Sequence, residues 1–398
     1  MNKKISLGVA VFLMALASAV TFVLGWIFSN YRSDSLLNQP ITVNNNMYKK
    51  IDEINDIVRE NYNGEIDETY LLDFISEGFA YGTGDTYANY YSAKEYTELK
   101  DDLNGKVVGI GISFVKDTEG YAKIISVYSD SPAEISGLAK GDQIVKIADF
   151  DVLTNYDNAI NAVKGDAGTT VKLVYRRAGE DTEVEITRRK ITVPSVESQI
   201  LEDNIAYIKI TDFTSSTVDQ FESAVSSALS NKVDGFIFDI RNNGGGTMKS
   251  VAQMLDMLVP EGPVIKSVDK TGEEKVVYTS DNAEVSVPMA VLVNKNTASA
   301  AELFAAALRD YNKAKLVGSN TYGKGVMQDI FPLSDGSAIK ITTSKFNPPV
   351  SENFDGVGLK PDFVVDLTAE QEKLWYELDG STDTQLIKAI SVVKALNK

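Results

Sequence analysis

Apolar positions recur every three or four residues over 47–62 and again over 68–79. This spacing places the apolar side chains on one face of an α-helix, so it predicts two amphipathic helices. The second helix is expected to end at Gly82-Thr-Gly-Asp85. Closely spaced tyrosines follow it, and we interpret them as an aromatic turn that packs on a neighbouring domain. They are Tyr87, Tyr90 and Tyr91.

The pattern changes between about 105 and 191, where apolar and polar residues alternate in short runs. Alternation with period two is typical of half-buried strands. One short helix is expected at 155–163, ended by Gly165. This block is therefore predicted to be a separate β-rich domain. Its expected strands are 107–114, 122–128, 143–147, 170–176 and 183–188.

From residue 192 onward, strand and helix patterns take turns, which predicts an α/β domain. The runs Phe236-Ile-Phe238 and Ala290-Val-Leu-Val293 are almost continuously apolar, so we expect a sheet that is covered on both faces. The final helix carries its apolar residues in one stripe, and we expect that stripe to be core or a dimer contact. Expected strands are 206–210, 235–240, 289–293, 315–318 and 338–343, and expected helices are 217–229, 248–258, 298–311 and 384–396.

The longest apolar run lies at the N-terminus, where Lys3 and Lys4 precede 24 uncharged, mostly apolar residues from Ile5 to Phe28. A helix of that length spans ~36 Å, enough for the ~30 Å hydrocarbon core of a bilayer. A cleaved signal peptide is the alternative, and small residues suited to cleavage occur over 15–19. The run continues well beyond them, however, and is longer than a usual secretory segment. We therefore expect an uncleaved signal anchor, with the N-terminus in the cytoplasm.

Composition removes several classes of function. The formal net charge of the 398 residues is −17, and this argues against nucleic acid as a partner because phosphate binding needs a basic face. The chain has no Cys and no His, so we expect no disulfide, no metal site and no other cofactor. A hydrolase built from it has neither imidazole nor thiolate. A Ser–Lys pair is one of the few remaining ways to run acyl transfer near neutral pH.

Two motifs stand close together in the β-rich block. They are Val108-Gly-Ile-Gly-Ile112 and Ser131-Pro-Ala-Glu-Ile-Ser-Gly-Leu-Ala-Lys-Gly-Asp-Gln-Ile144. The first alone is equally typical of an ordinary glycine-bearing strand and turn, but the pair resembles a PDZ domain. Backbone N–H groups at such a strand start can capture a terminal carboxylate, and the strand edge can accept an extended peptide. The candidate peptide-binding residues are Gly109, Ile110, Gly111 and Ile112.

Three segments of the α/β region carry candidate chemistry, and each has an ordinary alternative. Ser299 in Asn296-Thr-Ala-Ser-Ala-Ala-Glu302 lies between a strand and a helix, where a nucleophile is exposed, but it is equally suited to be a helix N-cap. The glycines of Arg241-Asn-Asn-Gly-Gly-Gly246 suit an oxyanion donor, since the P-loop pattern that phosphate would require is missing. Lys324 in Tyr322-Gly-Lys-Gly-Val-Met-Gln328 becomes a base if burial lowers its pKa; a surface-loop lysine is the alternative.

Taken together, the three segments resemble the C-terminal processing peptidases, also called tail-specific proteases. In that family the serine and lysine lie 25 residues apart and a glutamine follows four residues later, as they do here. Two further segments match, and the resemblance runs from about Met47 to the C-terminus. Thr297 and Ala301 stand where serine is usual and Gly244 where proline is usual, but no catalytic atom is lost. The further segments are Gly356-Val-Gly-Leu-Lys-Pro-Asp362 and Asp383-Thr-Gln-Leu386.

The resemblance implies a role for each matching residue. Ser299 would be the nucleophile, Lys324 the general base and Gln328 its positioner, while Gly245 and Ala300 would supply oxyanion N–H groups. It also implies a mixed α/β superhelical core related to the crotonase-like and Clp-protease folds, with the PDZ domain inserted before it. Members of the family often dimerise through their terminal helices, so a homodimer stays open, and they also use the PDZ domain as a gate.

The sequence thus predicts a multi-domain α/β serine endopeptidase, anchored in the plasma membrane and acting outside the cytoplasm on proteins with exposed C-termini. The simple anchor and the lack of Cys fit a Gram-positive-type surface protein. Two alternatives are a surface PDZ adaptor with an inactive protease core and a crotonase-like acyl-CoA enzyme. The expected segments are a cytoplasmic tail (1–4), the anchor (5–28), a tether with helices (29–103), the PDZ domain (104–191), the peptidase core (192–365) and a C-terminal helical segment (366–398).

Overall fold

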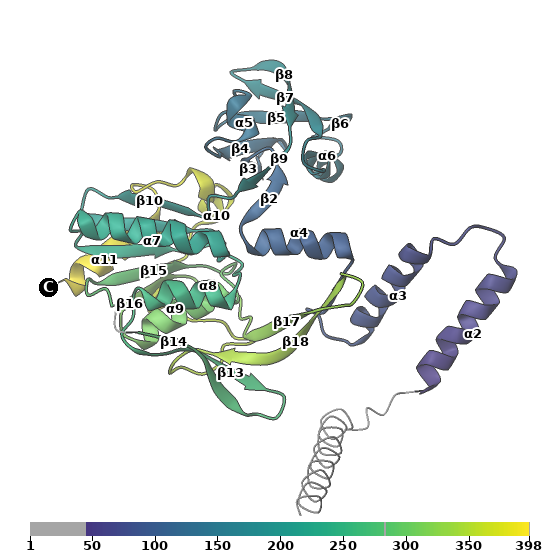
Figure 1. Ribbon diagram of the computed structural model, residues 1–398. Helices are drawn as coiled ribbons and strands as arrows, with labels where there is room; N and C mark the ends of the chain where they lie inside the picture. The colour runs from purple at the N-terminus through teal and green to yellow at the C-terminus, as the bar shows by residue number, and fades with distance from the viewer. Residues whose placement is uncertain (1–44, 282–283, 398) are drawn as a thin grey trace, which may run out of the picture. The chain divides into compact units, whose positions relative to one another are not determined.

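The computed structural model describes residues 45–281 and 284–397 (Figure 1). The predicted cytoplasmic tail and anchor lie outside these residues. Within the described part of the chain, no helix is long and apolar enough to cross a membrane. The chain divides into two units, 1–68 and 69–398. In the first, helix α2 (Asn45–Asn61) confirms the first predicted amphipathic helix.

A six-stranded sheet organises the peptidase region of the second unit. Its order is β10-β11-β12-β15-β16-β19, and every neighbouring pair is parallel except β10 with β11. Strands that run parallel bring their carboxyl ends to one edge, and this is where sites form in such sheets. The strands are β10 (Val196–Ile200), β11 (Ile205–Ile210), β12 (Gly235–Asp239), β15 (Met289–Val293), β16 (Ala314–Gly318) and β19 (Phe363–Val364).

The two central strands are buried along their whole length, as their apolar runs predicted. Successive side chains of a strand point to opposite faces. Phe236 and Phe238 accordingly join one core cluster with α7, α8 and α9, while Ile237 joins a second with α11 (Figure 1). The α11 residues Leu386 and Val393 are therefore core of this chain, whereas Ile387 and Leu396 of the same stripe are exposed. The helices are α7 (Ser215–Ser230), α8 (Met248–Asp256), α9 (Ala300–Asp310) and α11 (Thr384–Leu396), and α10 (Ala369–Lys373) precedes the last.

A second sheet, largely unpredicted, packs beside the first and takes its edge strand from the N-terminal segment. Strand β1 (Asn89–Tyr91) pairs with β18, Tyr90 lying opposite Ile339. The aromatic turn thus packs on the peptidase region, as the tyrosines indicated. Helix α3 (Glu68–Gly82) precedes this strand and α4 (Ala93–Leu103), which the sequence did not predict, follows it. The other strands are β13 (Gly262–Asp269), β14 (Glu274–Ser280), β17 (Val326–Pro332) and β18 (Ala338–Asn347).

The β-rich block forms its own sheet, ordered β3-β4-β5-β7-β8, with its own core. The single strand predicted at 107–114 is wrong: β2 pairs with β9, and β3 is a separate edge strand. Gly111 separates them at φ +87, where an added Cβ would lie 2.2 Å from the Cβ of Ser131. The elements are β2 (Lys106–Gly109), β3 (Ile112–Lys116), β4 (Ala122–Val127), α5 (Pro132–Ile135), β5 (Gln143–Ile147), β6 (Phe150–Asp151), α6 (Tyr156–Val163), β7 (Thr170–Arg177), β8 (Glu180–Thr187) and β9 (Arg189–Thr192).

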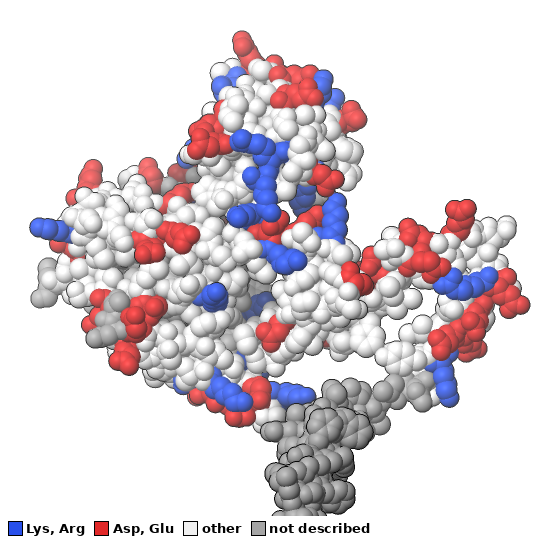
Figure 2. All heavy atoms as spheres, viewed as in Figure 1, with Lys and Arg blue, Asp and Glu red and all other residues white. Residues whose placement is uncertain are grey.

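Charged side chains of both signs are interspersed over the face drawn in Figure 2. Many of their ion pairs are exposed; in the pair of Lys172 with Glu183 the side chains are 62% and 63% exposed. Such pairs contribute about 0–1 kcal/mol because water screens them. The ion pairs that matter for the fold are the few that lie inside it.

Candidate active site

Ser299 lies where the chain leaves central strand β15 and enters helix α9. Two hydrogen bonds to the end of β12 and the loop after it fix the turn before Ser299. The Thr297 hydroxyl donates to the carbonyl of Ile240 at 2.9 Å, and the Ala298 N–H donates to the carbonyl of Asn243 at 3.0 Å. Ser299 itself has φ 56° and ψ −121°. A non-glycine residue at positive φ is strained, and such strain gathers at functional sites. This geometry displays the hydroxyl at the carboxyl edge of the sheet.

The carboxylate of Glu302, fully buried one turn into α9, joins the serine to the lysine loop. Its Oε2 accepts the N–H groups of Ser299 at 2.8 Å and Lys324 at 2.9 Å. Its Oε1 accepts the N–H of Gly323 at 2.7 Å and the hydroxyl of Thr321 at 2.5 Å. Four donors thus satisfy one buried acceptor group, as a polar group removed from water requires. The two segments that carry the predicted nucleophile and base are held together here.

Lys324 is half-buried on the loop before β17. Glycines flank it because neighbouring atoms leave no room for a side chain. A Cβ added to Gly323 would lie 2.7 Å from the N atom of Gly358. One added to Gly325 would lie 2.5 Å from Oδ1 of Asn353. Burial, and then repulsion from Lys340, lower the pKa of Lys324 below the usual 10.5, while Asp85 opposes them. This is the direction that a general base needs.

The side chains of the predicted dyad are not hydrogen-bonded to each other. Among the described residues, neither Ser299 Oγ nor Gln328 makes a hydrogen bond with Lys324 Nζ. The Nζ atom lies instead over the ring of Tyr87, 4.3 Å from its centroid. The Gln328 amide donates to the hydroxyl of Thr342 at 3.1 Å. The structure therefore brings the backbones of Ser299 and Lys324 together and leaves the base side chain turned elsewhere.

The predicted oxyanion donors lie side by side at the serine. A Cβ added to Gly245 would lie 3.1 Å from the N atom of Ala300 and 3.1 Å from the Cβ of Ser299. The N–H of Ala300 has no acceptor among the described residues. The N–H of Gly245, in contrast, donates to Oδ1 of Asn243 at 2.8 Å. The first N–H is thus available as a donor, whereas the second is engaged within its own loop.

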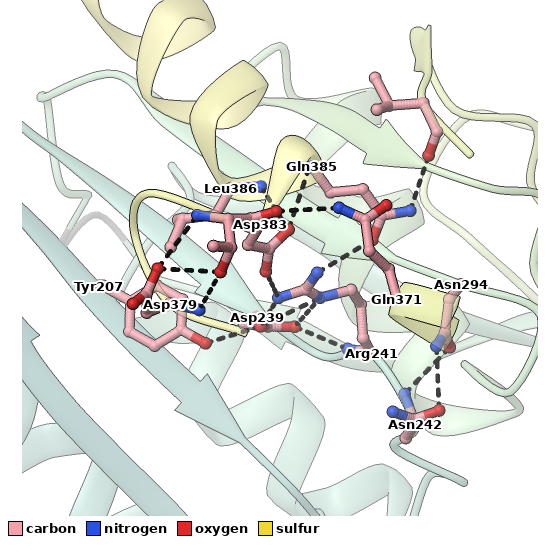
Figure 3. A network of polar contacts seen from close by, with 12 residues as sticks. Tyr207, Asp239, Arg241, Asn242, Asn294, Gln371, Asp379, Asp383, Gln385 and Leu386 are labelled. Atoms are coloured by element: carbon pink, nitrogen blue, oxygen red, sulfur yellow. Dashed lines mark hydrogen bonds and ion pairs between the residues drawn. The ribbon is translucent and has the colours of Figure 1, made fainter. Parts of the chain in front are cut away.

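A buried ion-pair network supports the glycine loop from the other side (Figure 3). Arg241 contacts Asp239 at 2.6 Å and Asp383 at 2.7 Å, and it also donates to Gln385 at 2.9 Å. Burial alone would raise the pKa of Asp239, but the Arg241 guanidinium outweighs it and holds that pKa below its usual range. Tyr207 donates a further hydrogen bond to Asp239 at 2.7 Å. The start of the loop is thereby tied to the first turn of α11.

The candidate peptide-binding residues lie where β2 leads into β3, with Ile110 buried in the core of the β-rich domain. Ile110 and Gly111 form the bend between β2 and β3, and Ile112 begins β3. Strand β3 ends its sheet, so one side of it has no partner strand. Within the described part of the chain, the N–H groups of Ile110 and Gly111 have no acceptor, while their carbonyls accept from Ala133 and Tyr128. A terminal carboxylate and an extended peptide need these two features.

Sequence reasoning missed Glu302, Arg241 and Tyr87 as parts of the site. Glu302 and Arg241 stand inside the motifs that located the serine and the glycine loop. A glutamate three residues into a helix is also a usual capping residue, so its second set of contacts gives no local signal. Tyr87 is 237 residues from Lys324 in sequence, and only the fold brings the two together.

Fold and site together define a serine peptidase of mixed α/β fold that carries a PDZ domain, and comparison with known proteins agrees. The model of peptidase family S41 matches residues 204–365, and that of the PDZ domain matches 108–187. A carboxy-terminal processing protease, CtpA of Bacillus subtilis (strain 168), is 30% identical over 97% of this chain and 84% of its own length. The chain belongs to peptidase family S41, a family of serine-type carboxy-terminal processing peptidases. The inactive-adaptor alternative is not favoured.

Two further relatives are informative. A probable CtpA-like serine protease of Staphylococcus haemolyticus (strain JCSC1435) is 32% identical over 81% of this chain, which spans 62% of that relative's length. Among solved structures, the photosystem II D1 C-terminal processing protease matches with a TM-score of 0.51 at 24% identity, over 87% of this chain and 90% of the other. This last likeness concerns the fold.

Replacing Glu302 by Gln should separate the serine from the lysine loop. An amide offers one acceptor oxygen where the carboxylate has two, so at least one buried N–H loses its partner, at about 1–3 kcal/mol per group. We expect the free energy of unfolding to fall by that amount and kcat/KM for a peptide to fall at least about tenfold. The matched control is Glu372→Gln, an exposed residue paired with Lys295. Equal effects in the two variants would contradict the structural role of Glu302.

Replacing Arg241 by Met should destabilise the peptidase region strongly. Two buried carboxylates, Asp239 and Asp383, would lose the one guanidinium that pairs with them among the described residues, and breaking a buried pair in this way costs about 3–5 kcal/mol. The control is Lys172→Met, which removes the exposed pair with Glu183 and should cost less than about 1 kcal/mol. Urea unfolding of both variants measures the difference. A cost for Arg241→Met no larger than the control's would refute this account.

Proposed function

We propose that this chain cleaves peptide bonds with a Ser–Lys dyad in which Ser299 is the nucleophile and Lys324 the general base. The observation that carries the proposal is the shared carboxylate of Glu302, which holds the backbones of both residues. The lowered pKa of Lys324 supports it, since burial favours the neutral amine. The chain has no His and no Cys that could replace either residue.

The reaction follows from these groups. Neutral Lys324 takes the proton of the Ser299 hydroxyl as its oxygen attacks the scissile carbonyl, and the N–H of Ala300 donates to the resulting oxyanion. The Lys324 ammonium then returns that proton to the leaving amine, and an acyl-enzyme remains. Water, deprotonated by the same amine, releases the acyl group and restores the serine. For these steps the lysine side chain must swing from Tyr87 to Ser299.

Gln328 and Gly245 complete the proposed machinery. Gln328 lies four residues beyond Lys324, and its amide oxygen can accept from the amine once the lysine has turned inward. Gly245 is the proposed second oxyanion donor. Its closeness to Ala300 and Ser299, where an added Cβ would lie 3.1 Å from an atom of each, supports this role. Its N–H must first leave Asn243, so substrate binding is expected to rearrange the glycine loop.

The proposed substrates are proteins with exposed C-termini, captured by the β-rich domain. Gly109, Ile110, Gly111 and Ile112 would bind the terminal carboxylate and the last residues of the substrate. The free edge of β3 and the unpaired N–H groups beside it support this role. Capture through the terminal carboxylate would bring the C-terminal end of the substrate to the enzyme, as the term carboxy-terminal processing describes.

We further propose that residues 5–28 anchor the chain in the plasma membrane and that the catalytic region acts outside the cytoplasm. The supporting observations are the 24-residue apolar run and the two lysines before it. The bacterial relatives from Bacillus and Staphylococcus fit the expectation of a Gram-positive-type surface protein.

Ser299→Ala and Lys324→Met should each abolish cleavage, with a loss of at least about 10³-fold in kcat, because each removes a group that reacts. Binding of a peptide with a free C-terminal carboxylate should persist in both variants, and the amidated peptide should bind more weakly. The matched control is Lys275→Met, an exposed lysine of β14. Cleavage by Ser299→Ala at the wild-type rate would eliminate this assignment, and a wild-type chain that binds peptide without cutting it would favour the adaptor.

The anchor is tested in cells. The full-length chain should stay with the membrane fraction through an alkaline carbonate wash, and protease added outside intact protoplasts should digest the catalytic region. A variant lacking residues 1–44 should be absent from the membrane fraction. Recovery of the full-length chain in the wash supernatant, or protection of the catalytic region from the added protease, would show that the proposed location is incorrect.

A further inference from the structure

The ring of Tyr87 lies against the cation of Lys324. The Nζ atom is 4.3 Å from the ring centroid, within the distance at which an aromatic face attracts an ammonium. Tyr87 comes from the segment between α3 and β1, far from the peptidase motifs in sequence. It is half-buried, and burial raises its own pKa, which favours the neutral ring.

Polar contacts hold the tyrosine in this place. The Asp85 carboxylate accepts the Tyr87 N–H at 2.9 Å and, on the neighbouring strand β18, the N–H and hydroxyl of Thr342 at 2.7 and 3.0 Å. The same Thr342 hydroxyl accepts from Gln328. The segment that carries the ring is therefore fastened to the strand beside the site, and the ring position follows from the fold.

The charged groups around Lys324 leave the ring as its close partner. Lys340 on β18 repels the ammonium and Asp85 attracts it, but neither is paired with it. Glu302 on α9 contacts only the lysine backbone, and Asp355 accepts the N–H of Gly325. Among the described residues, no carboxylate lies within 4.0 Å of Lys324 Nζ.

We propose that Tyr87 is a positioning residue that holds the Lys324 ammonium away from Ser299 in the resting enzyme. The proposal rests on the role proposed above for Lys324. A cation–π contact stabilises the charged form alone, so the ring opposes proton loss and counteracts the burial around the amine. Tyr87 also lines a cleft of about 540 Å³ with Thr86, Tyr322 and Val326. A chain that enters this cleft meets the ring.

The sign of the effect is fixed by the charge. A ring that favours the ammonium raises the pKa of Lys324 relative to an apolar group of the same shape. Weakening the negative face of the ring must therefore lower the pH at which the amine becomes neutral. The strength of a desolvated cation–π contact corresponds to a shift of roughly half to one and a half pH units.

The test compares rings of equal shape and different electrostatics in the full-length chain. Phe and 3,4,5-trifluorophenylalanine replace Tyr87 in turn, since fluorine removes electron density from the ring face without changing its packing. Lysine labelled with ¹³C at Cε reports the titration midpoint of each chain, and the Lys324 signal is assigned by its loss in Lys324→Met. Tyr87→Phe should titrate like wild type, whose midpoint lies below 10.5, and the fluorinated chain should titrate at lower pH by the stated shift.

Tyr91 supplies the matched control, because its ring lies on Lys340 at 5.5 Å in the same segment. Tyr91→Phe and the fluorinated residue at 91 should give equal Lys324 midpoints. A Lys324 midpoint that is the same for Phe and the fluorinated ring at 87, or higher for the latter, overturns the proposal. The titration needs no turnover, so it separates the two claims: a chain that cleaves peptides but shows no ring-dependent shift overturns this inference alone. A chain that shows the shift but cleaves nothing overturns the proposed activity instead.

Discussion

One buried carboxylate connects the parts of this site. Glu302 accepts the backbone N–H groups of both Ser299 and Lys324, which come from two different loops, one after β15 and one before β17. A carboxylate buried away from water needs hydrogen-bond donors for both of its oxygens. The N–H groups that point at it are equally costly to leave unpaired. The hydrogen bonds to Glu302 are therefore expected to form or break together, since losing one leaves a buried group unpaired. It also explains how the strained backbone of Ser299 persists, because a local strain of about 1–3 kcal/mol is sustained only where the surroundings determine it.

Buried apolar strands support this contact, and an ion-pair network supports it where one of these strands ends. Strands β12 and β15 are buried throughout, and their last residues lead directly into the two loops of the site. Where β12 ends, Asp239 begins the network that continues through Arg241 to the N-cap residue of α11, Asp383 (Figure 3). A buried cation between two carboxylates contributes less net stability than its contacts suggest, because all three groups were desolvated. Its effect is to fix one arrangement of loop and helix.

The sequence predicted well those parts whose pattern is dictated by burial. Strand β15 has the predicted limits because it is one continuous buried apolar run, and helix α11 has them because its buried residues recur with the helical period. Strand β14 and helix α4 were missed because they bury almost nothing and so carry no such period. The same distinction holds at the site. Ser299 and Lys324 were found from motif spacing, whereas the contact of Tyr87 with Lys324 depends on residues that only the tertiary fold brings together.

The site thus separates what is fixed from what moves. The Lys324 backbone is held by Glu302 and packed between glycines that leave no room for a Cβ, so neither the loop nor its register can shift at low cost. The side chain beyond it has four rotatable bonds and lies against an aromatic ring. Among the described residues it has no ion-pair partner. Bringing the amine from Tyr87 to Ser299 then requires rotation of one side chain rather than refolding of the loop that carries it. Because a single rotation is small and rapid, the proposed control of activity resides in what favours each position of the amine: the ring of Tyr87 for the charged form, and the serine hydroxyl for the neutral one.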